Sequence, residues 1–250
     1  MILCLLLLAM SAAAGSESEP VLLLEGKLFP LDFAGGQLTI HGSPLLVTEE
    51  ANSGLGTGLT VWDGSVVLAK YLEARYPSLA GKRVLEVGSG PGVAGLAALA
   101  LGATVTFSDL PYCLPNLRAT VVRNGHLVKA GAQPPAVGEL DWTAPQRSSL
   151  PGLQSMDIVV GADVVWVEEL IPPLVSTLAW LSAGPAPPAI LLAHQTRSTR
   201  GDDLLHAELA QAGLRATAVP PELHHPDFAH PRISILLIER AGAPAHSAEL

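Results

Sequence analysis

The segment VLEVGSGPG, residues 84–92, constrains the fold of this 250-residue chain more than any other stretch. Its first half is apolar enough for a buried strand, and glycines follow at positions 88, 90 and 92. Glycine permits positive φ angles and lets a ligand approach the backbone closely. The apolar segment 92–102 then predicts a helix, whose first turn presents unpaired N–H groups and the positive end of the helix dipole. A strand, a glycine turn and a helix in this order predict a ligand site at one edge of an α/β sheet.

Strand-like and helix-like segments alternate through the rest of the chain. Strands are predicted at 82–90, 103–109, 126–142, 156–165, 188–195, 214–220 and 232–240, and helices at 61–77, 92–102, 111–125, 167–181 and 200–213. This alternation implies a mostly parallel sheet with helices on both faces. Short apolar runs between glycines and prolines in residues 21–47 predict a small hairpin ahead of that sheet.

Composition excludes several classes of protein. Hydrophobic residues make up 49% of the chain and charged residues 15%, which excludes disorder over most of its length. The formal net charge is −9, whereas a nucleic-acid-binding protein needs a basic surface to displace counterions. With only two cysteines, Cys4 and Cys113, neither a disulfide framework nor a zinc site is expected, and we predict no metal.

The glycines alone leave three interpretations open. Residues 90–95, GPGVAG, satisfy the G-x-G-x-x-G pattern of dinucleotide sites, and S-adenosylmethionine is held by a similar loop. A glycine turn needed only for strand–helix packing is the third. Glu86 favours a cationic amino or sulfonium ligand over a pyrophosphate. Asp109, at the end of the second predicted strand, could accept hydrogen bonds from both ribose hydroxyls, as in either cofactor class. Its alternative role is to cap the helix that begins near Pro111.

Several motifs together resemble one family. They are Gly58 with Val61-Trp62-Asp63-Gly64 and LAKYLE, then VLEVGSGPGVAGLAA, FSDLPYCLPNL, ELDW and DIVVGADVVWVEELIPPLVSTL. From about residue 38 to 240 the chain resembles the seven-β-strand protein-lysine methyltransferases, in the methyltransferase-like 21 group. That group includes the valosin-containing-protein lysine methyltransferase and its elongation-factor and chaperone relatives. The resemblance implies a Rossmann-like, seven-stranded class I methyltransferase fold.

The resemblance also implies a cofactor and a set of residues that hold it. The cofactor is S-adenosylmethionine, with the glycine loop and the acid after the second strand as its main contacts. A Leu-x-Trp element, here Leu140 to Trp142, frames the adenine, and Trp62 lies over the cofactor. The implied cofactor-binding residues are Trp62, Glu86, Gly88, Gly90, Gly92, Asp109, Leu110, Trp142 and Ala162.

The implied catalytic residues are Asp163 and Trp166, where this chain departs from the family. The family commonly carries Asp-x-x-Tyr after its fourth strand, whereas this chain has Asp163-Val164-Val165-Trp166. A tryptophan can still line a lysine channel through a cation–π contact, but its N–H is a donor only. Asp163 could instead cap a helix ahead of Glu168, and Trp166 could simply pack in the core.

The resulting hypothesis is methyl transfer from S-adenosylmethionine to a lysine ε-amine by direct displacement. Partners implied by the family are a chaperone, an AAA ATPase or an elongation factor, with no nucleic acid and no membrane, and we expect a monomer. The loop 194–197 follows a predicted strand and could line the substrate channel. An NAD-dependent oxidoreductase, a non-catalytic binding protein of the same fold, and a methyltransferase for small molecules or other side chains remain alternatives.

We divide the chain into four parts: a targeting segment at 1–15, an extension with the hairpin at 16–60, the methyltransferase domain at 61–240 and a tail at 241–250. Residues 2–10 are continuously apolar and small residues follow, as in a secretory signal peptide, but no lysine or arginine precedes them. Because the cofactor would have to be delivered into a lumen for a secreted form, we favour the cytoplasm. Secretory or organellar targeting stays open.

Overall fold

A seven-stranded sheet forms the centre of the computed structural model, which describes residues 27–50, 56–184 and 186–242. Its order is β5-β4-β3-β6-β7-β9-β8. The strands in that order are Ala136–Glu139, Thr104–Asp109, Arg83–Val87, Ile158–Ala162, Ala189–Gln195, Ile233–Arg240 and Leu214–Ala218. The first five are parallel, and β9 runs antiparallel to both β7 and β8. Parallel strands end at one common edge, so this topology gathers the loops that follow them.

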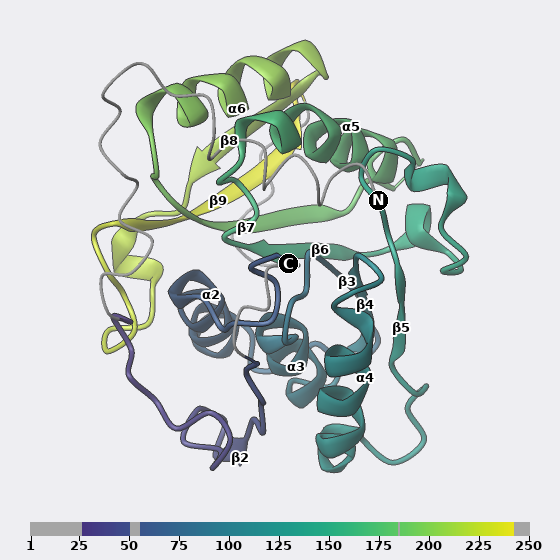
Figure 1. Ribbon diagram of the computed structural model, residues 1–250, viewed down its shortest axis with the longest axis vertical. Coiled ribbons are helices and arrows are strands. Elements are labelled where there is room, and N and C mark those ends of the chain that lie inside the picture. Colours follow the sequence, from purple (N-terminus) through teal and green to yellow (C-terminus); the bar gives the residue numbers. More distant parts are fainter. Residues whose placement is uncertain (1–26, 51–55, 185, 243–250) are drawn as a thin grey trace.

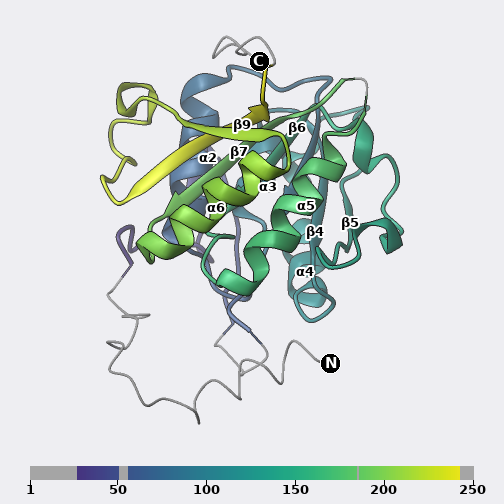
Figure 2. The same cartoon turned by 90° about the horizontal axis from the view of Figure 1, so that it is seen from above.

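Helices cover both faces of the sheet (Figure 1). On one face lie α2 (Asp63–Arg75), α3 (Val93–Ala100) and α4 (Leu114–Arg123). On the other lie α5 (Ile171–Leu181) and α6 (Thr199–Gln211), which Figure 2 shows side by side. Each layer has its own buried apolar cluster against the sheet. The predicted seven-stranded, mostly parallel sheet with helices on both faces is therefore confirmed.

The predicted helix at 167–181 begins later than the sequence indicated. Residues Glu168–Leu170 form a 3₁₀ turn, and α5 starts at Ile171. Two prolines follow Ile171, and proline is tolerated in a first helical turn because its missing N–H would have no partner there. The acidic pair Glu168 and Glu169 therefore lies in the turn before α5, not in the first turn of the helix itself.

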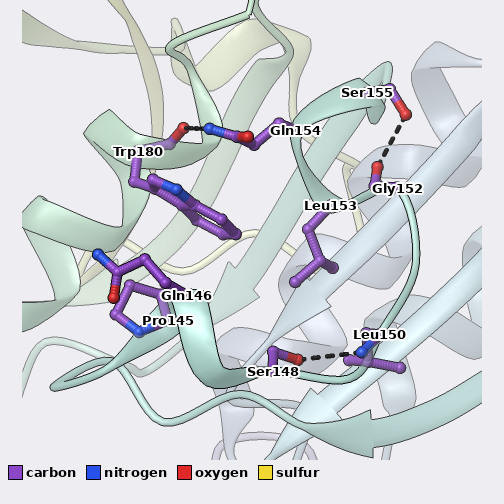
Figure 3. Close-up of a pocket in the computed structure, with 9 residues that line it drawn as sticks. All are labelled: Pro145, Gln146, Ser148, Leu150, Gly152, Leu153, Gln154, Ser155 and Trp180. Carbon is purple, nitrogen blue, oxygen red and sulfur yellow. Dashed lines mark hydrogen bonds between the residues drawn. The ribbon is translucent and has the colours of Figure 1, made fainter.

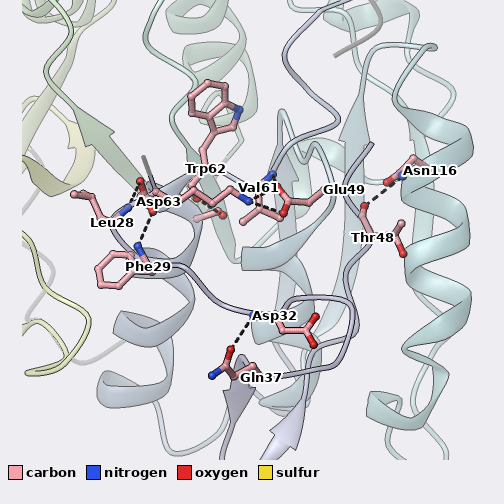
Figure 4. A network of polar contacts seen from close by, with 12 residues as sticks. Leu28, Phe29, Asp32, Gln37, Thr48, Glu49, Val61, Trp62, Asp63 and Asn116 are labelled. Carbon is pink, nitrogen blue, oxygen red and sulfur yellow. Dashed lines mark hydrogen bonds and ion pairs between the residues drawn. The ribbon is translucent and has the colours of Figure 1, made fainter. Parts of the chain in front are cut away.

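The predicted hairpin is present and short. Strands β1 (Thr39–Ile40) and β2 (Ser43–Pro44) pair antiparallel, joined by His41 and Gly42, which both have positive φ. Apolar side chains of residues 33–47 share a buried cluster with α2 and α3. The Asp63 carboxylate at the start of α2 accepts hydrogen bonds from the backbone N–H groups of Leu28 and Phe29 (Figure 4). The extension is thus attached to the helix that precedes the first strand of the sheet.

Some predictions fall outside the described residues, namely the targeting segment 1–15, part of the extension and most of the tail. The boundaries of the four parts stay predictions. Within the described residues, no helix is both long and apolar enough to cross a membrane.

Candidate active site

The loops after β3, β4, β6 and β7 meet at the carboxyl edge of the sheet. Ser89 fastens the loop after β3 to Ser108, near the end of β4: Ser89 N–H donates to Ser108 O at 3.0 Å, and Ser108 N–H donates to Ser89 Oγ at 3.0 Å. Both hydroxyls also donate to the Glu86 carbonyl oxygen, Ser108 Oγ at 2.7 Å. Sequence reasoning missed these two serines, although Ser89 stands inside the glycine loop itself.

The glycine loop adopts a backbone that few other residues could. Gly88, Gly90 and Gly92 have φ of 61°, 52° and 91°, in the left-handed region. A Cβ on Gly90 would lie 3.0 Å from the carbonyl oxygen of Gly58. The predicted positive φ thus matches the conformation of the loop, and close approach of a ligand stays a prediction.

The side-chain carboxylate of Asp109 holds backbone N–H groups at this edge, including one in the glycine loop. Its Oδ2 accepts from Gly90 N–H and its Oδ1 from Leu110 N–H, both at 2.7 Å. Burial raises the pKa of the Asp109 carboxyl, and these two N–H groups oppose the rise. The helix after it begins at Leu114 with no side-chain cap, so the alternative role as helix cap is wrong. Contact with a ribose stays a prediction.

Glu86 lies deeper than the sequence indicated. It is 2% exposed, and its Oε1 accepts from the backbone N–H of Ala94 in α3 at 3.2 Å. Its Oε2 is buried and has no hydrogen-bond partner within the described part of the chain. Burial raises the pKa of this carboxyl to about 8. The side chain is therefore aimed at the first turn of α3, and contact with a cationic ligand stays a prediction.

One indole borders the loop, and a second belongs to the segment before α2. A Cβ on Gly88 would lie 3.2 Å from Cζ2 of Trp142, so the Trp142 indole packs beside that glycine. Trp62 precedes α2, and its Nε1–H donates to the carbonyl oxygen of Thr57 at 3.1 Å. Figure 4 shows its indole projecting away from the contacts of Asp63. The groups present are left-handed glycines, a carboxylate that can accept from hydroxyls, and two indoles with apolar faces. This combination fits the adenosine part of S-adenosylmethionine, its ribose included.

Asp163 stands at the end of β6, directly after Ala162, with φ of 52°, unusual for a residue other than glycine. Its Oδ2 accepts from the backbone N–H of Gly64 in the first turn of α2 at 2.8 Å. The turn at Glu168 has no side-chain cap. The alternative that Asp163 caps the helix ahead of Glu168 is therefore wrong, because the helix it caps is α2.

Arg197 lies in the loop after β7, which the sequence suggested as a channel lining, but its partner was not predicted. Its Nη2 donates to Asp163 Oδ1 at 3.3 Å, and its Cζ lies 5.5 Å from the centroid of the Trp62 ring. Burial raises the pKa of the Asp163 carboxyl, whereas the Arg197 guanidinium lowers it. The loop position had suggested a channel-lining role, but nothing in the local pattern indicated this pairing.

Other residues predicted for this site or near it lie as follows. Trp166 is half-buried between β6 and the 3₁₀ turn, so the alternative of a fully buried core residue does not describe it. His194 is buried, and its Nε2 lies 2.7 Å from Asp202 Oδ1 in α6. Among the described residues, no three histidine, cysteine or acidic side chains are grouped as a metal site would require.

A shallow pocket of about 330 Å³ lies elsewhere (Figure 3). Its lining includes Leu153–Ser155, which leads into the amino end of β6, and Trp180, near the end of α5. Gln154 joins the two segments through a hydrogen bond from its Nε2 to the Trp180 carbonyl oxygen at 3.0 Å. Because Asp163 follows the carboxyl end of β6, this pocket is separate from the candidate active site.

Comparisons with known proteins agree with this geometry. The fold is similar to that of the ribosomal protein L11 methylase from Lactobacillus delbrueckii subsp. bulgaricus, with a TM-score of 0.50 and 17% identity over 73% of this chain and 80% of that one. The implied class I methyltransferase fold is thus confirmed.

Sequence relatives point to one activity. The chain is 33% identical to EEF1A lysine methyltransferase 3 of Mus musculus over 78% of this chain and 85% of the relative. It is 39% identical to protein N-lysine methyltransferase METTL21A of Danio rerio over 63% and 69% of the two chains. The family model described as lysine methyltransferase matches residues 40–208. The chain therefore belongs to the lysine methyltransferase family.

Proposed function

We propose that this chain methylates a lysine side chain of a protein substrate at the carboxyl edge of its sheet. The observation that carries the proposal is that Asp163 and the glycine loop share this edge, with Val164 beside Gly88. This arrangement supports a site in which a carboxylate serves the acceptor and a glycine loop serves the donor. Membership of the lysine methyltransferase family supports the same reaction.

The cofactor half of the site would be formed by the loop after β3 and its neighbours. S-adenosylmethionine supplies an activated methyl group on a sulfonium when it is bound. Asp109 already accepts from the N–H groups of Gly90 and Leu110, and the remaining lone pairs of this half-buried residue's carboxylate could accept from ribose hydroxyls. Trp142, beside Gly88, would offer an apolar face to the adenine. Ala162, Gly92, Glu86 and Trp62 complete the proposed cofactor-binding set.

The acceptor half would be formed by Asp163 and Trp166. A free lysine amine has a pKa of about 10.4, so it arrives charged, and only the neutral form can attack the methyl group. Aromatic walls that exclude water favour the neutral amine, while Asp163 would orient its nitrogen. Holding the reacting atoms at about 3–3.5 Å supplies the remaining catalysis, with the proton released to solvent.

The protein substrate can be narrowed by its chemistry and by the relatives. Relatives named EEF1A lysine methyltransferase 3 make elongation factor 1A the first acceptor to test, ahead of chaperones and AAA ATPases. The net charge of −9 suits a lysine-rich target surface. We propose that the enzyme acts in the cytoplasm, as a monomer.

The test is transfer of radiolabelled methyl groups from S-adenosylmethionine to purified elongation factor 1A and to a cell lysate, followed by mass spectrometry of labelled proteins. We expect methyllysine with the wild-type chain and its loss with Asp163→Ala. The matched control is Asp157→Ala, since Asp157 lies at the other end of β6 and pairs with Arg83 at the surface.

Three results would contradict the proposal. Labelling of other side chains or of small molecules would change the substrate class. Equal activity of both aspartate variants would remove Asp163 from the reaction. Cofactor binding by calorimetry without any transfer would favour the non-catalytic binding protein.

A further inference from the structure

Arg197 occupies an unusual place between the two halves of the candidate site. Its guanidinium contacts the carboxylate of Asp163 and faces the ring of Trp62. The Arg197 side chain is 24% exposed, whereas that of Asp163 is 4% exposed. The pair is therefore reached from the Arg197 side, at the edge where an acceptor lysine would enter.

Asp163 does not need Arg197 in order to hold α2. Its Oδ2 is bonded to Gly64 N–H, and Arg197 reaches the other oxygen, Oδ1. A nearby surface pair shows the contrast: Arg200 Nε lies 2.9 Å from Glu168 Oε2, and the Arg200 side chain is 84% exposed. Arg200 belongs to an exposed surface pair, whereas Arg197 lies against an indole and a buried carboxylate.

The charge of Asp163 presents a chemical problem for the proposed reaction. An unpaired carboxylate beside the acceptor would stabilise the ammonium form of lysine, which has no free electron pair. The charged groups around Asp163 are Asp63 at the start of α2, His194 at the end of β7 and Arg197. His194 is itself paired with Asp202 of α6, and Asp63 binds backbone N–H groups. Arg197 is therefore the permanent positive charge that directly contacts this carboxylate.

We propose that Arg197 is a positioning residue that neutralises Asp163, so that the acceptor lysine is held as a free amine and not as an ammonium ion. This inference rests on the proposed function and adds a determinant of the lysine's protonation. Asp163 keeps one lone-pair direction for orienting the amine while its net charge is balanced. The Trp62 ring lies beside the guanidinium. A lysine at position 197 would keep the positive charge but would lack the planar group that an arginine offers to this ring.

The experiment compares Arg197→Gln and Arg197→Lys with the control Arg200→Gln. Methyl transfer from radiolabelled S-adenosylmethionine to lysate proteins is measured on one labelled band at saturating cofactor, from about pH 6.5 to about pH 10. For Arg197→Gln we expect the midpoint of the pH–rate profile to rise by about one to two units, as expected on removing a neighbouring charge. The rate should then fall by at least about tenfold near pH 7 and recover in alkali.

Arg197→Lys retains the charge and should keep the wild-type midpoint, even where its rate is lower. Arg200→Gln should match the wild type throughout. The double variant Asp163→Asn with Arg197→Gln removes both charges, and its midpoint should return to the wild-type value whatever its rate. If Arg197→Gln does not fold, Arg197→Met, which also removes the charge but keeps a long side chain against the Trp62 ring, takes its place and should show the same rise in the midpoint.

A rate for Arg197→Gln that is equally low at every pH would overturn the inference, because a merely structural role gives that pattern. An unchanged profile would overturn it as well. In both cases the wild-type chain still methylates lysine, so the proposed function stands. A wild-type chain that methylates no lysine would instead refute the proposed function, and the inference with it.

Discussion

The two halves of the candidate site are held together in different ways. In the cofactor half, the carboxylates of Asp109 and Glu86 accept hydrogen bonds from backbone N–H groups 19 and 8 positions away. In the acceptor half, Asp163 is bonded to Gly64, 99 positions away, and to the side chain of Arg197, 34 positions away. One half is a local motif, and the other is assembled by the tertiary fold.

Because of this difference, the two halves should respond differently to side-chain substitution. Backbone donors cannot be removed by substituting their own side chains, so the cofactor half should tolerate many changes other than at its glycines and acids. The acceptor half depends on the ion pair between the side chains of Arg197 and Asp163 and on the indole of Trp166, so single side-chain substitutions can remove its contacts. The departure at Trp166 from the family's tyrosine falls in that second half.

The largest effect is expected from Gly90→Val. At φ of 52° a β-branched residue is strained, and its Cβ would lie 3.0 Å from the backbone oxygen of Gly58. We expect binding of S-adenosylmethionine to become undetectable by isothermal titration calorimetry. Asp163→Ala, in the acceptor half, should bind the cofactor normally.

The matched control for that variant is Gly131→Val. Gly131 has φ of 79° but nothing within 4 Å of a Cβ built on it, so it carries the same backbone strain without the crowding. Cofactor affinity should be unchanged there. Equal loss at both glycines would mean that strain alone weakens binding, and the two halves would then not be separable in this way.

The second effect in size is expected from Asp109→Ala. Removing a charged acceptor typically costs about 1.5–3 kcal/mol, so cofactor affinity should fall by about 10- to 150-fold. Asp109→Asn keeps one acceptor oxygen and should lose less. Calorimetry measures both variants, and normal binding by Asp109→Ala would exclude the predicted ribose contact.

The sequence predicted the cofactor half better than the acceptor half for a physical reason. Glycine positions, strand ends and the Asp109 carboxylate follow from local hydrophobic patterns and from the limits that φ places on side chains. All seven strands of the sheet were indicated in this way. The resemblance to the methyltransferase family then supplied the cofactor and the residues expected to hold it. The cofactor-binding roles themselves stay predictions.

Pairings across the fold carry no such local signal. Arg197 stands in a polar loop, HQTRS, with nothing to distinguish it from Arg200, three positions later. Its importance depends on β7 ending beside β6, which brings it to Asp163. The depth of Glu86 was missed because a strand pattern gives the face of a side chain but not what covers that face.

Glu86→Gln is expected to change how stability depends on pH, without a direct effect on the reaction. The folded pKa of about 8 lies above the ordinary value of 4.5, so the folded chain keeps a proton that the unfolded chain releases between these limits. The contribution of Glu86 to the stability of the wild type is therefore complete below pH 4.5 and is lost as the pH rises toward about 8. The slope is up to about 1.4 kcal/mol per pH unit.

Glutamine stays neutral, so the variant should lack this decline and gain on the wild type as pH rises. Urea unfolding at about pH 5.5, 6.5 and 7.5 measures the difference. Glu169→Gln, at an exposed position, is the control and should follow the wild type. Parallel curves for Glu86→Gln and the wild type would show that the buried carboxyl is charged in the fold.

The smallest effect is expected from Trp166→Ala, in the acceptor half. A partly exposed cation–π contact contributes about 0.5–1 kcal/mol, so the KM for the protein substrate should rise by about two- to fivefold. Trp166→Phe and Trp166→Tyr keep a ring face and should stay closer to the wild type. Trp180→Ala, in the pocket at the other end of β6, is the control and should leave KM unchanged. A fall in cofactor affinity with an unchanged KM would move Trp166 from the acceptor half into the cofactor half.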